Sequence, residues 1–192
     1  MVNLADEMLL YHGSYARVDE IRLELCAPAK DFGKGYYLTS DYKQAVRFVP
    51  NSLRKAQAIG RAAISQDYGY VMTYRVHLTN EDLLVHEFES ADAEWLRFVA
   101  INRRSNLAKT LARTSDRRIQ RSDVIIGKIA NDTTNAVITT YLNGLYGKIG
   151  QGRAEETAIG LLLPDRLKNQ YCFRSALAIG CLELVEVTKH VI

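Results

Sequence analysis

The sequence predicts an α+β domain. Apolar residues alternate with polar ones in several short segments, and elsewhere they recur every three or four residues, so both strands and helices are expected. These segments lack the regular strand–helix–strand order that predicts a doubly wound parallel sheet. The 192 residues suit one domain, and the chain has no internal repeat or linker-like tract. We therefore expect a single domain over residues 1–192.

In the first half of the chain, extended segments are expected at 9–14, 18–25, 36–39, 70–78 and 83–88. The first ends at a Gly-Ser turn, and a glycine-punctuated loop precedes the third. Ser40 or Asp41 could cap a helix through Val49, because their side-chain oxygens can accept the first free N–H groups. Pro50 is expected to end or kink that helix, with helical spacing resuming over 52–64.

In the second half, helical spacing is expected over 92–102 and 133–142, with Asp132 as a cap for the latter. Residues 144–152 form a glycine-rich loop, and residues 175–180 show no clear pattern. The remaining extended segments are expected at 124–127, 161–163, 171–173 and 182–187.

Composition excludes several classes of protein. With 47% hydrophobic and 24% charged residues, the chain is an ordinary globular one rather than a disordered one. No uncharged apolar run approaches the roughly 18 residues of a membrane span, and no secretory signal is expected. The three cysteines form no CxxC pair, which argues against a disulfide framework or a zinc site. We expect a cytoplasmic protein without a metal site or a membrane partner.

The net charge of +3 is unevenly distributed. The segment from Arg103 to Arg121 carries seven basic residues and one acidic residue, Asp116, which gives it a net charge of +6. Such a segment is most simply a solvated helix face, and it could also contact phosphates or an acidic partner. It contains no aromatic residue, which argues against base stacking.

Two short motifs suggest a site. The first is Tyr11-His12-Gly13-Ser14, and the second is Asp-Phe-Gly-Lys-Gly-Tyr-Tyr-Leu-Thr over 31–39. Taken singly, each fits a strand end or a turn with a structural histidine or tyrosine. Glycine allows close backbone approach, and a strand places Tyr36 and Tyr37 on opposite faces.

Together, the two motifs resemble the ADP-ribosyltransferase fold, in the branch of the poly(ADP-ribose) polymerases and diphtheria-type toxins. The chain also looks like an uncharacterised bacterial family of this fold. The wider similarity includes Gln44-Ala45, Trp95 with Asn102-Arg103, residues 123–132 and Gln170-x-x-Phe173. The resemblance implies a split mixed β-sheet core with flanking helices, NAD+ as co-substrate, and a toxin-like role with a small antitoxin partner.

The resemblance also implies roles for individual residues. His12 would hydrogen-bond a hydroxyl of the nicotinamide ribose, and Gly13 would clamp the carboxamide through its backbone. Tyr37 would stack on the nicotinamide ring, with Phe48 as a second stacking aromatic. Phe48 could equally be a core residue of an amphipathic helix. Further cofactor contacts are expected from Tyr11, Ser14, Phe32 and Gly35.

The sequence departs from the branch at the third catalytic position. The branch places a Glu on a late strand, and the matching residue here is Gln170. A carboxylate would stabilise the positive charge that develops on the ribose. A Gln carries no charge and can only orient the ribose through hydrogen bonds. Glu155 and Glu156 are alternative carboxylates in an expected loop. Chain elongation into a polymer is therefore not expected.

The leading hypothesis is an NAD+-dependent mono-ADP-ribosyltransferase, a bacterial toxin that modifies a protein or nucleic acid. One alternative is an NAD+ glycohydrolase, in which water is the acceptor. The other is a catalytically inactive binding module that uses the segment from Arg103 to Arg121.

Overall fold

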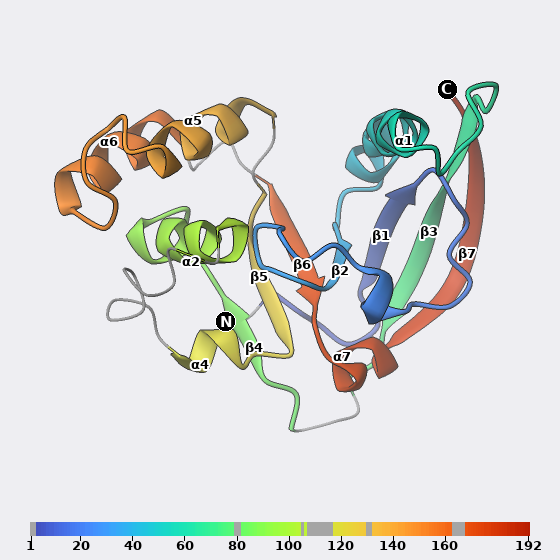
Figure 1. Ribbon diagram of the computed structural model, residues 1–192. Coiled ribbons are helices and arrows are strands. Elements are labelled where there is room, and N and C mark those ends of the chain that lie inside the picture. The colour runs from blue at the N-terminus through green and yellow to red at the C-terminus, as the bar shows by residue number, and fades with distance from the viewer. Residues whose placement is uncertain (1–2, 79–81, 105, 107–116, 130–131, 163–167) are drawn as a thin grey trace.

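The computed structural model describes residues 3–78, 82–104, 106, 117–129, 132–162 and 168–192. Its strands form two sheets with helices on their outer faces, so the predicted α+β class is confirmed (Figure 1). One sheet has the strand order β1-β3-β7, and the other has the order β2-β6-β5-β4.

The three-stranded sheet is antiparallel throughout and contains β1 (Leu9–Ser14), β3 (Tyr68–Val76) and β7 (Leu182–Val191). Helix α1 (Tyr42–Ala58) covers one face of this sheet. Its Ala45 and Val49 pack against Val71 of β3. Asp41 caps the helix by accepting a hydrogen bond from the backbone N–H of Gln44.

The four-stranded sheet is mixed. Strand β6 (Asn169–Phe173) pairs antiparallel with β2 (Tyr36–Leu38) and β5 (Val124–Lys128), and β5 pairs parallel with β4 (Val85–Glu87). Helices α2 (Ala93–Arg103), α5 (Asp132–Leu142) and α6 (Gly152–Leu162) cover its outer face. Short helical segments are α4 (Arg117–Gln120), α7 (Ala176–Gly180) and the 3₁₀ turn η1 (Leu23–Leu25).

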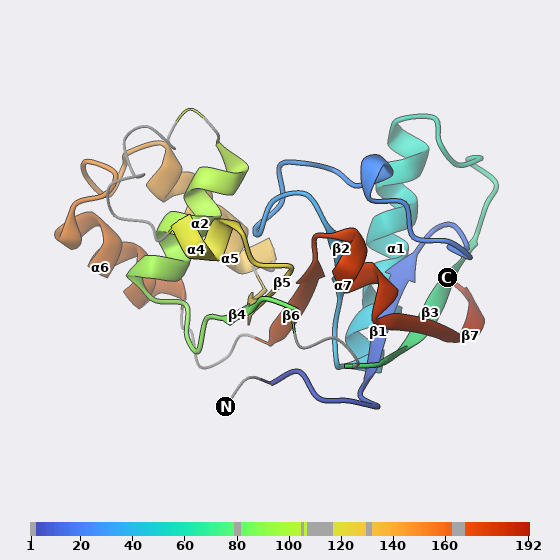
Figure 2. The ribbon, with the colours of Figure 1, turned by 90° about the horizontal axis from the view of Figure 1, so that it is seen from below.

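Side chains alternate across both sheets and build two large apolar clusters. Leu10 and Met72 of the first sheet meet Leu38, Ile126 and Phe173 of the second between the sheets. On the outer face of the second sheet, the helices contribute a cluster that includes the following buried residues: Trp95, Leu96, Phe98, Ile138, Tyr141, Ala158. The molecule is thus layered as helix, sheet, sheet and helices (Figure 2).

The edge strands β1 and β2 of the two sheets are bridged by backbone hydrogen bonds at one point and diverge from it. Tyr11 of β1 exchanges both of its backbone hydrogen bonds with Thr39, which directly follows β2. In the described residues, this bridge is the only backbone pairing between the two sheets. Beyond this bridge the two strands separate. The two motifs, Tyr11-His12-Gly13-Ser14 and residues 31–39, therefore lie next to each other at the split between the strands.

Most predicted elements are confirmed, and the following expectations are corrected. Helix α1 continues through Pro50 and ends at Ala58 instead of reaching residue 64. Its buried face, with Ala45, Val49, Leu53 and Ala56, runs past the proline, so packing on the sheet outweighs the lost hydrogen bond. Residues 18–25 form no strand and end in η1, and residues 175–180 contain α7.

The other two corrections concern α6. Residues 161–163 were expected to be extended, but Leu161 and Leu162 are helical. Glu155 and Glu156 lie in the same helix and not in a loop. Buried residues at 154, 155, 158 and 162 give the helical spacing, which the glycines before 152 obscure in the sequence.

Within the described part of the chain, no helix combines the length and the apolar character that a bilayer crossing requires.

Candidate functional site

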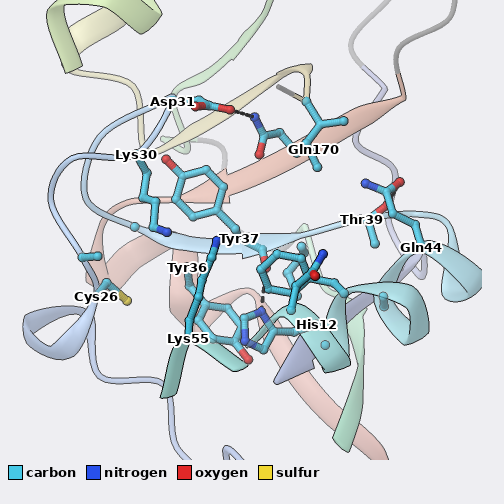
Figure 3. A pocket seen from close by; sticks show the side chains of 18 of the residues that line it. His12, Cys26, Lys30, Asp31, Tyr36, Tyr37, Thr39, Gln44, Lys55 and Gln170 are labelled. Atoms are coloured by element: carbon cyan, nitrogen blue, oxygen red, sulfur yellow. Dashed lines mark hydrogen bonds between the residues drawn. The ribbon is translucent and has the colours of Figure 1, made fainter. Parts of the chain in front are cut away.

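A cavity of about 1160 Å³ lies at the split between β1 and β2. Helix α1 forms one wall, and the loop that carries Lys30 and Asp31 forms another (Figure 3). The cavity brings together seven of the nine residues predicted for the site from the sequence: Tyr11, His12, Gly13, Gly35, Tyr37, Phe48, Gln170.

His12 is held in one orientation. Its Nδ1 lies 2.8 Å from the carbonyl oxygen of Tyr37, and its ring stacks on Tyr36 at a centroid distance of 4.4 Å. A carbonyl can only accept, so Nδ1 carries the proton. Burial lowers the pKa of His12 from 6.5, an effect that the bond to Tyr37 opposes. The ring is therefore neutral at physiological pH, and its Nε2 is a hydrogen-bond acceptor.

Close packing against α1 leaves no room for a side chain at position 13, and the backbone N–H and C=O of Gly13 face the cavity. A Cβ at this position would collide with the backbone carbonyl of Ala45 in α1. Tyr11 directs its backbone N–H and C=O away from β3, toward Thr39. Because backbone directions repeat every second residue in a strand, the N–H and C=O of Gly13 also point away from β3. They lie at the cavity, past the point where β2 has diverged.

Tyr37 fixes the loop that precedes it. Its hydroxyl donates to the carbonyl of Gly33 at 2.8 Å and accepts from the backbone N–H of Phe32 at 3.0 Å. Burial raises the pKa of Tyr37 far above that of a free tyrosine, so the phenol stays protonated. Its ring can contact a ligand, but its hydroxyl is occupied.

Phe48 is an exposed aromatic at the cavity. The residue is 44% exposed although it lies on α1, whose other apolar side chains at 45, 49, 53 and 56 are buried against the sheet. The reading of Phe48 as a core residue is therefore wrong. An aromatic side chain that lines a cavity and remains open to solvent is suited to stacking on a planar ligand.

Gln170 of β6 is 6% exposed and takes part in a polar cluster on the cavity wall. Its Nε2 donates to Oδ2 of Asp31 at 3.1 Å. Oδ1 of Asp31 accepts from Nε and Nη2 of Arg103, at 2.8 and 2.6 Å. Arg103 also donates to Oδ1 of Asn135 at 2.6 Å. A carboxylate therefore stands directly beside Gln170 (Figure 3).

Cationic side chains form another part of the cavity wall. Arg47, Arg54 and Lys55 project from one side of α1, and Lys30 comes from the facing loop. Burial lowers the pKa of Lys30, and the nearby charge of Lys55 lowers it further. Figure 3 shows the Lys30 and Lys55 side chains extending toward each other. Like charges that converge on a cavity suit an anionic ligand, whose binding would relieve their repulsion.

Two predicted residues do not line the cavity. Ser14 is buried at the end of β1, where its hydroxyl accepts a hydrogen bond from the N–H of Ala16. Phe32 is fully buried and stacks on Phe88 in the helix-side cluster. Neither side chain can therefore contact a ligand in this cavity directly. Phe32 instead anchors the loop that presents Asp31.

The alternative carboxylates, Glu155 and Glu156, lie on α6 and away from the cavity. Glu155 is 2% exposed and accepts two hydrogen bonds from Arg97 of α2, at 2.6 and 2.5 Å. The hydroxyl of Tyr141 lies 3.4 Å from the same carboxylate. Neither Glu155 nor Glu156 lines the cavity. Glu155 thus ties α6 to α2.

The basic segment contributes less free surface than its charge suggests. Arg103 is bound to Asp31, and Arg104 donates to the carbonyl of Leu142 at 2.8 Å and to Asn143 at 2.7 Å. Arg118 and Arg121 are exposed. Three of the predicted contact residues lie outside the described part or have undescribed side chains: Lys109, Arg113, Arg117.

Several cavity residues were missed by sequence reasoning. Asp31 lies inside the second motif, where the sequence predicts only a glycine-punctuated loop, and Arg103 begins the basic segment, which the sequence predicts to be a solvated helix face. The cations of α1 recur at 47, 54 and 55, a helical spacing that was available as a signal. Asn135 carried no signal, because only the fold brings it to Arg103.

The fold and the cavity define an α+β protein with a cavity, lined in part by cationic and aromatic side chains, in a split between two sheets. The model of the family described as "Protein of unknown function (DUF3990)" matches residues 8–184. The chain belongs to this family. A search of curated proteins found no match.

Proposed function

We propose that the protein is an NAD+-dependent mono-ADP-ribosyltransferase that modifies a macromolecule. The observation that carries the proposal is the convergence of His12, Gly13, Tyr37 and Phe48 on one cavity. These are the residues to which the sequence resemblance assigns the nicotinamide and its ribose. They come from β1, β2 and α1, and their convergence did not follow from local sequence alone.

The geometry supports a role for each group. The neutral His12 can accept a hydrogen bond from a ribose hydroxyl at Nε2. The N–H and C=O of Gly13 match the acceptor and donor of a carboxamide. The ring of Tyr37 and the exposed ring of Phe48 can contact the nicotinamide. The cations of α1 and Lys30 supply a counter-charge for a diphosphate.

The reaction needs no further co-reactant. The bond between C1′ of the ribose and the nicotinamide nitrogen breaks, and its electron pair neutralises the positive pyridinium nitrogen. The acceptor nucleophile then adds to C1′ and releases its proton to water. Transfer to water instead of a macromolecule would make the protein an NAD+ glycohydrolase.

Binding of NAD+ is tested by a thermal-shift titration of the wild type and of His12→Ala. His77→Ala, which changes a histidine outside the cavity, is the matched control. At a concentration of 100 times Kd, a ligand adds about 2.7 kcal/mol, which raises the Tm of a chain of this size by about 5–10 °C. We expect the rise in wild type and His77→Ala and its loss in His12→Ala. No rise in any of the three at millimolar NAD+ would refute the proposal.

Labelled NAD+ separates the two reactions. A transferase adds the label to a protein or nucleic-acid acceptor, whereas a glycohydrolase releases nicotinamide and leaves the acceptor unlabelled. The toxin role and the antitoxin partner follow from the resemblance alone, and the cytoplasmic location follows from composition alone; all three stay predictions.

A further inference from the structure

We propose that Asp31 is the catalytic carboxylate of this site and that Gln170 and Arg103 position it. The inference rests on the proposed function, because it assigns a role in nicotinamide release. Gln170 carries no net charge at the position where the resembled enzymes carry a Glu, so another group would have to supply negative charge beside the ribose.

The carboxylate is placed at the cavity and oriented from both sides. Asp31 lines the cavity and is 9% exposed. Gln170 holds Oδ2 at 3.1 Å, and Arg103 holds Oδ1 through two N–H groups at 2.8 and 2.6 Å. Since Asn135 in turn holds Arg103 at 2.6 Å, the position of Asp31 is determined by groups from β6, α2 and α5.

The backbone around Asp31 is also fixed. Tyr37 holds the next residue, Phe32, at its N–H and the following Gly33 at its carbonyl. Gly33 has a φ of +80°, which favours glycine, and a Cβ there would meet Oδ1 of Asn102 at 2.7 Å. Full burial of Phe32 anchors the same turn. A charge held this firmly needs no reorganisation when the reaction begins, which is the condition for effective electrostatic catalysis.

The chemistry favours a negative charge beside the ribose, and Asp31 carries one that its ion pair with Arg103 balances only in part. As the bond to nicotinamide breaks, positive charge develops on C1′ and the ring oxygen of the ribose. The amide of Gln170 carries no net charge, but the carboxylate hydrogen-bonded to it can oppose that charge. A single Glu on the late strand would provide both the position and the negative charge. In this protein, Gln170 occupies the strand position and Asp31 supplies the charge.

A swap of the two groups tests this assignment. Asp31→Asn removes the charge and keeps the shape. The double variant Asp31→Asn/Gln170→Glu restores a carboxylate on the other member of the hydrogen-bonded pair and keeps the net charge of the wild type. Asp19→Asn is the matched control, because it makes the same change in an exposed ion pair with Arg17. Each variant is assayed for NAD+ affinity by thermal-shift titration and for nicotinamide release.

We expect Asp31→Asn to bind NAD+ within about threefold of wild type and to release nicotinamide about 10²- to 10³-fold more slowly, the usual loss for a preorganised electrostatic group. The swap should recover at least about tenfold of that loss, and Asp19→Asn should match wild type. If Asp31→Asn does not fold, Asp31→Asn/Arg103→Gln, which removes both members of the ion pair, takes its place: a folded, inactive double variant supports the assignment, and a folded, active one overturns it.

Gln170→Ala tests positioning. We expect kcat to fall with little change in KM, whereas a merely structural residue would alter Tm and leave kcat of the folded enzyme unchanged. An active wild type with an equally active Asp31→Asn would overturn the role of Asp31 alone. A wild type that neither binds NAD+ nor releases nicotinamide would overturn the proposed function itself.

Discussion

Phe48 allows the stacking role to be tested almost separately from folding. The Phe48→Ala substitution removes a ring that is 44% exposed at the cavity. A change at a partly exposed position costs about 1 kcal/mol of unfolding free energy or less, and alanine is the better helix former. The variant should therefore stay folded, and a loss of ligand affinity can be assigned to the missing ring.

The size of the loss follows from the exposed area. An aromatic side chain has a surface of about 200 Å², so Phe48 offers about 90 Å² to a ligand at its exposed fraction of 44%. A stacked ring that covers half to all of this area would gain about 1–2 kcal/mol at about 25 cal/mol per Å². We therefore expect Phe48→Ala to raise the Kd for NAD+ by about 5- to 30-fold.

The assay is a calorimetric titration of NAD+ into wild type, Phe48→Ala and Leu145→Ala. Leu145 is 74% exposed and does not line the cavity, so its removal controls for loss of an exposed apolar side chain. Equal affinity of wild type and Phe48→Ala would refute the stacking role. Equal losses in Phe48→Ala and Leu145→Ala would show that the effect does not come from the cavity.

Three further predictions concern stability. Gly13→Ala should lower Tm by about 6–12 °C in a thermal melt, because its Cβ would meet a backbone carbonyl of α1 and overpacking costs up to about 3 kcal/mol; an unchanged Tm would contradict the close approach. Glu155→Gln should cost about 2–3 kcal/mol in a denaturant titration, since it leaves Arg97 unpaired at a site that is 24% exposed and thus partly screened; a loss below about 0.5 kcal/mol would show that the pair contributes little. The hydrogen bond between His77 and Glu183 raises the pKa of His77 from 6.5 and lowers that of Glu183 from 4.5. Its stabilisation is complete between pH 4.5 and 6.5 and is lost as the pH rises through the raised pKa of His77 or falls through the lowered pKa of Glu183. The Tm difference between wild type and His77→Ala should therefore be largest near about pH 5.5 and shrink as the pH moves away from it in either direction; a difference independent of pH would exclude this origin.

Local sequence determined most of the elements of this fold. Alternating apolar residues predicted the central strands, and Asp41 caps α1, as one of the two alternatives predicted for this position. The two motifs also contain five of the predicted site residues that line the cavity, through a resemblance that already joined His12 to Tyr37. The strands and helix caps depend on residues close to each other in the sequence, so short windows contain the necessary information.

Only the tertiary structure decided which polar groups meet. Gln170 and Asp31 are separated by 139 positions, and Arg103 reaches Asp31 across 72. Glu155 is a second example. The sequence allowed it as an alternative catalytic carboxylate, but the packing of α6 on α2 places it in an ion pair with Arg97. Such pairs depend on how the sheets and helices pack against one another. The entropic cost of bringing distant residues together is offset by burial of the whole core and not by any local pattern. The identity of the carboxylate beside Gln170 was therefore a property of the fold.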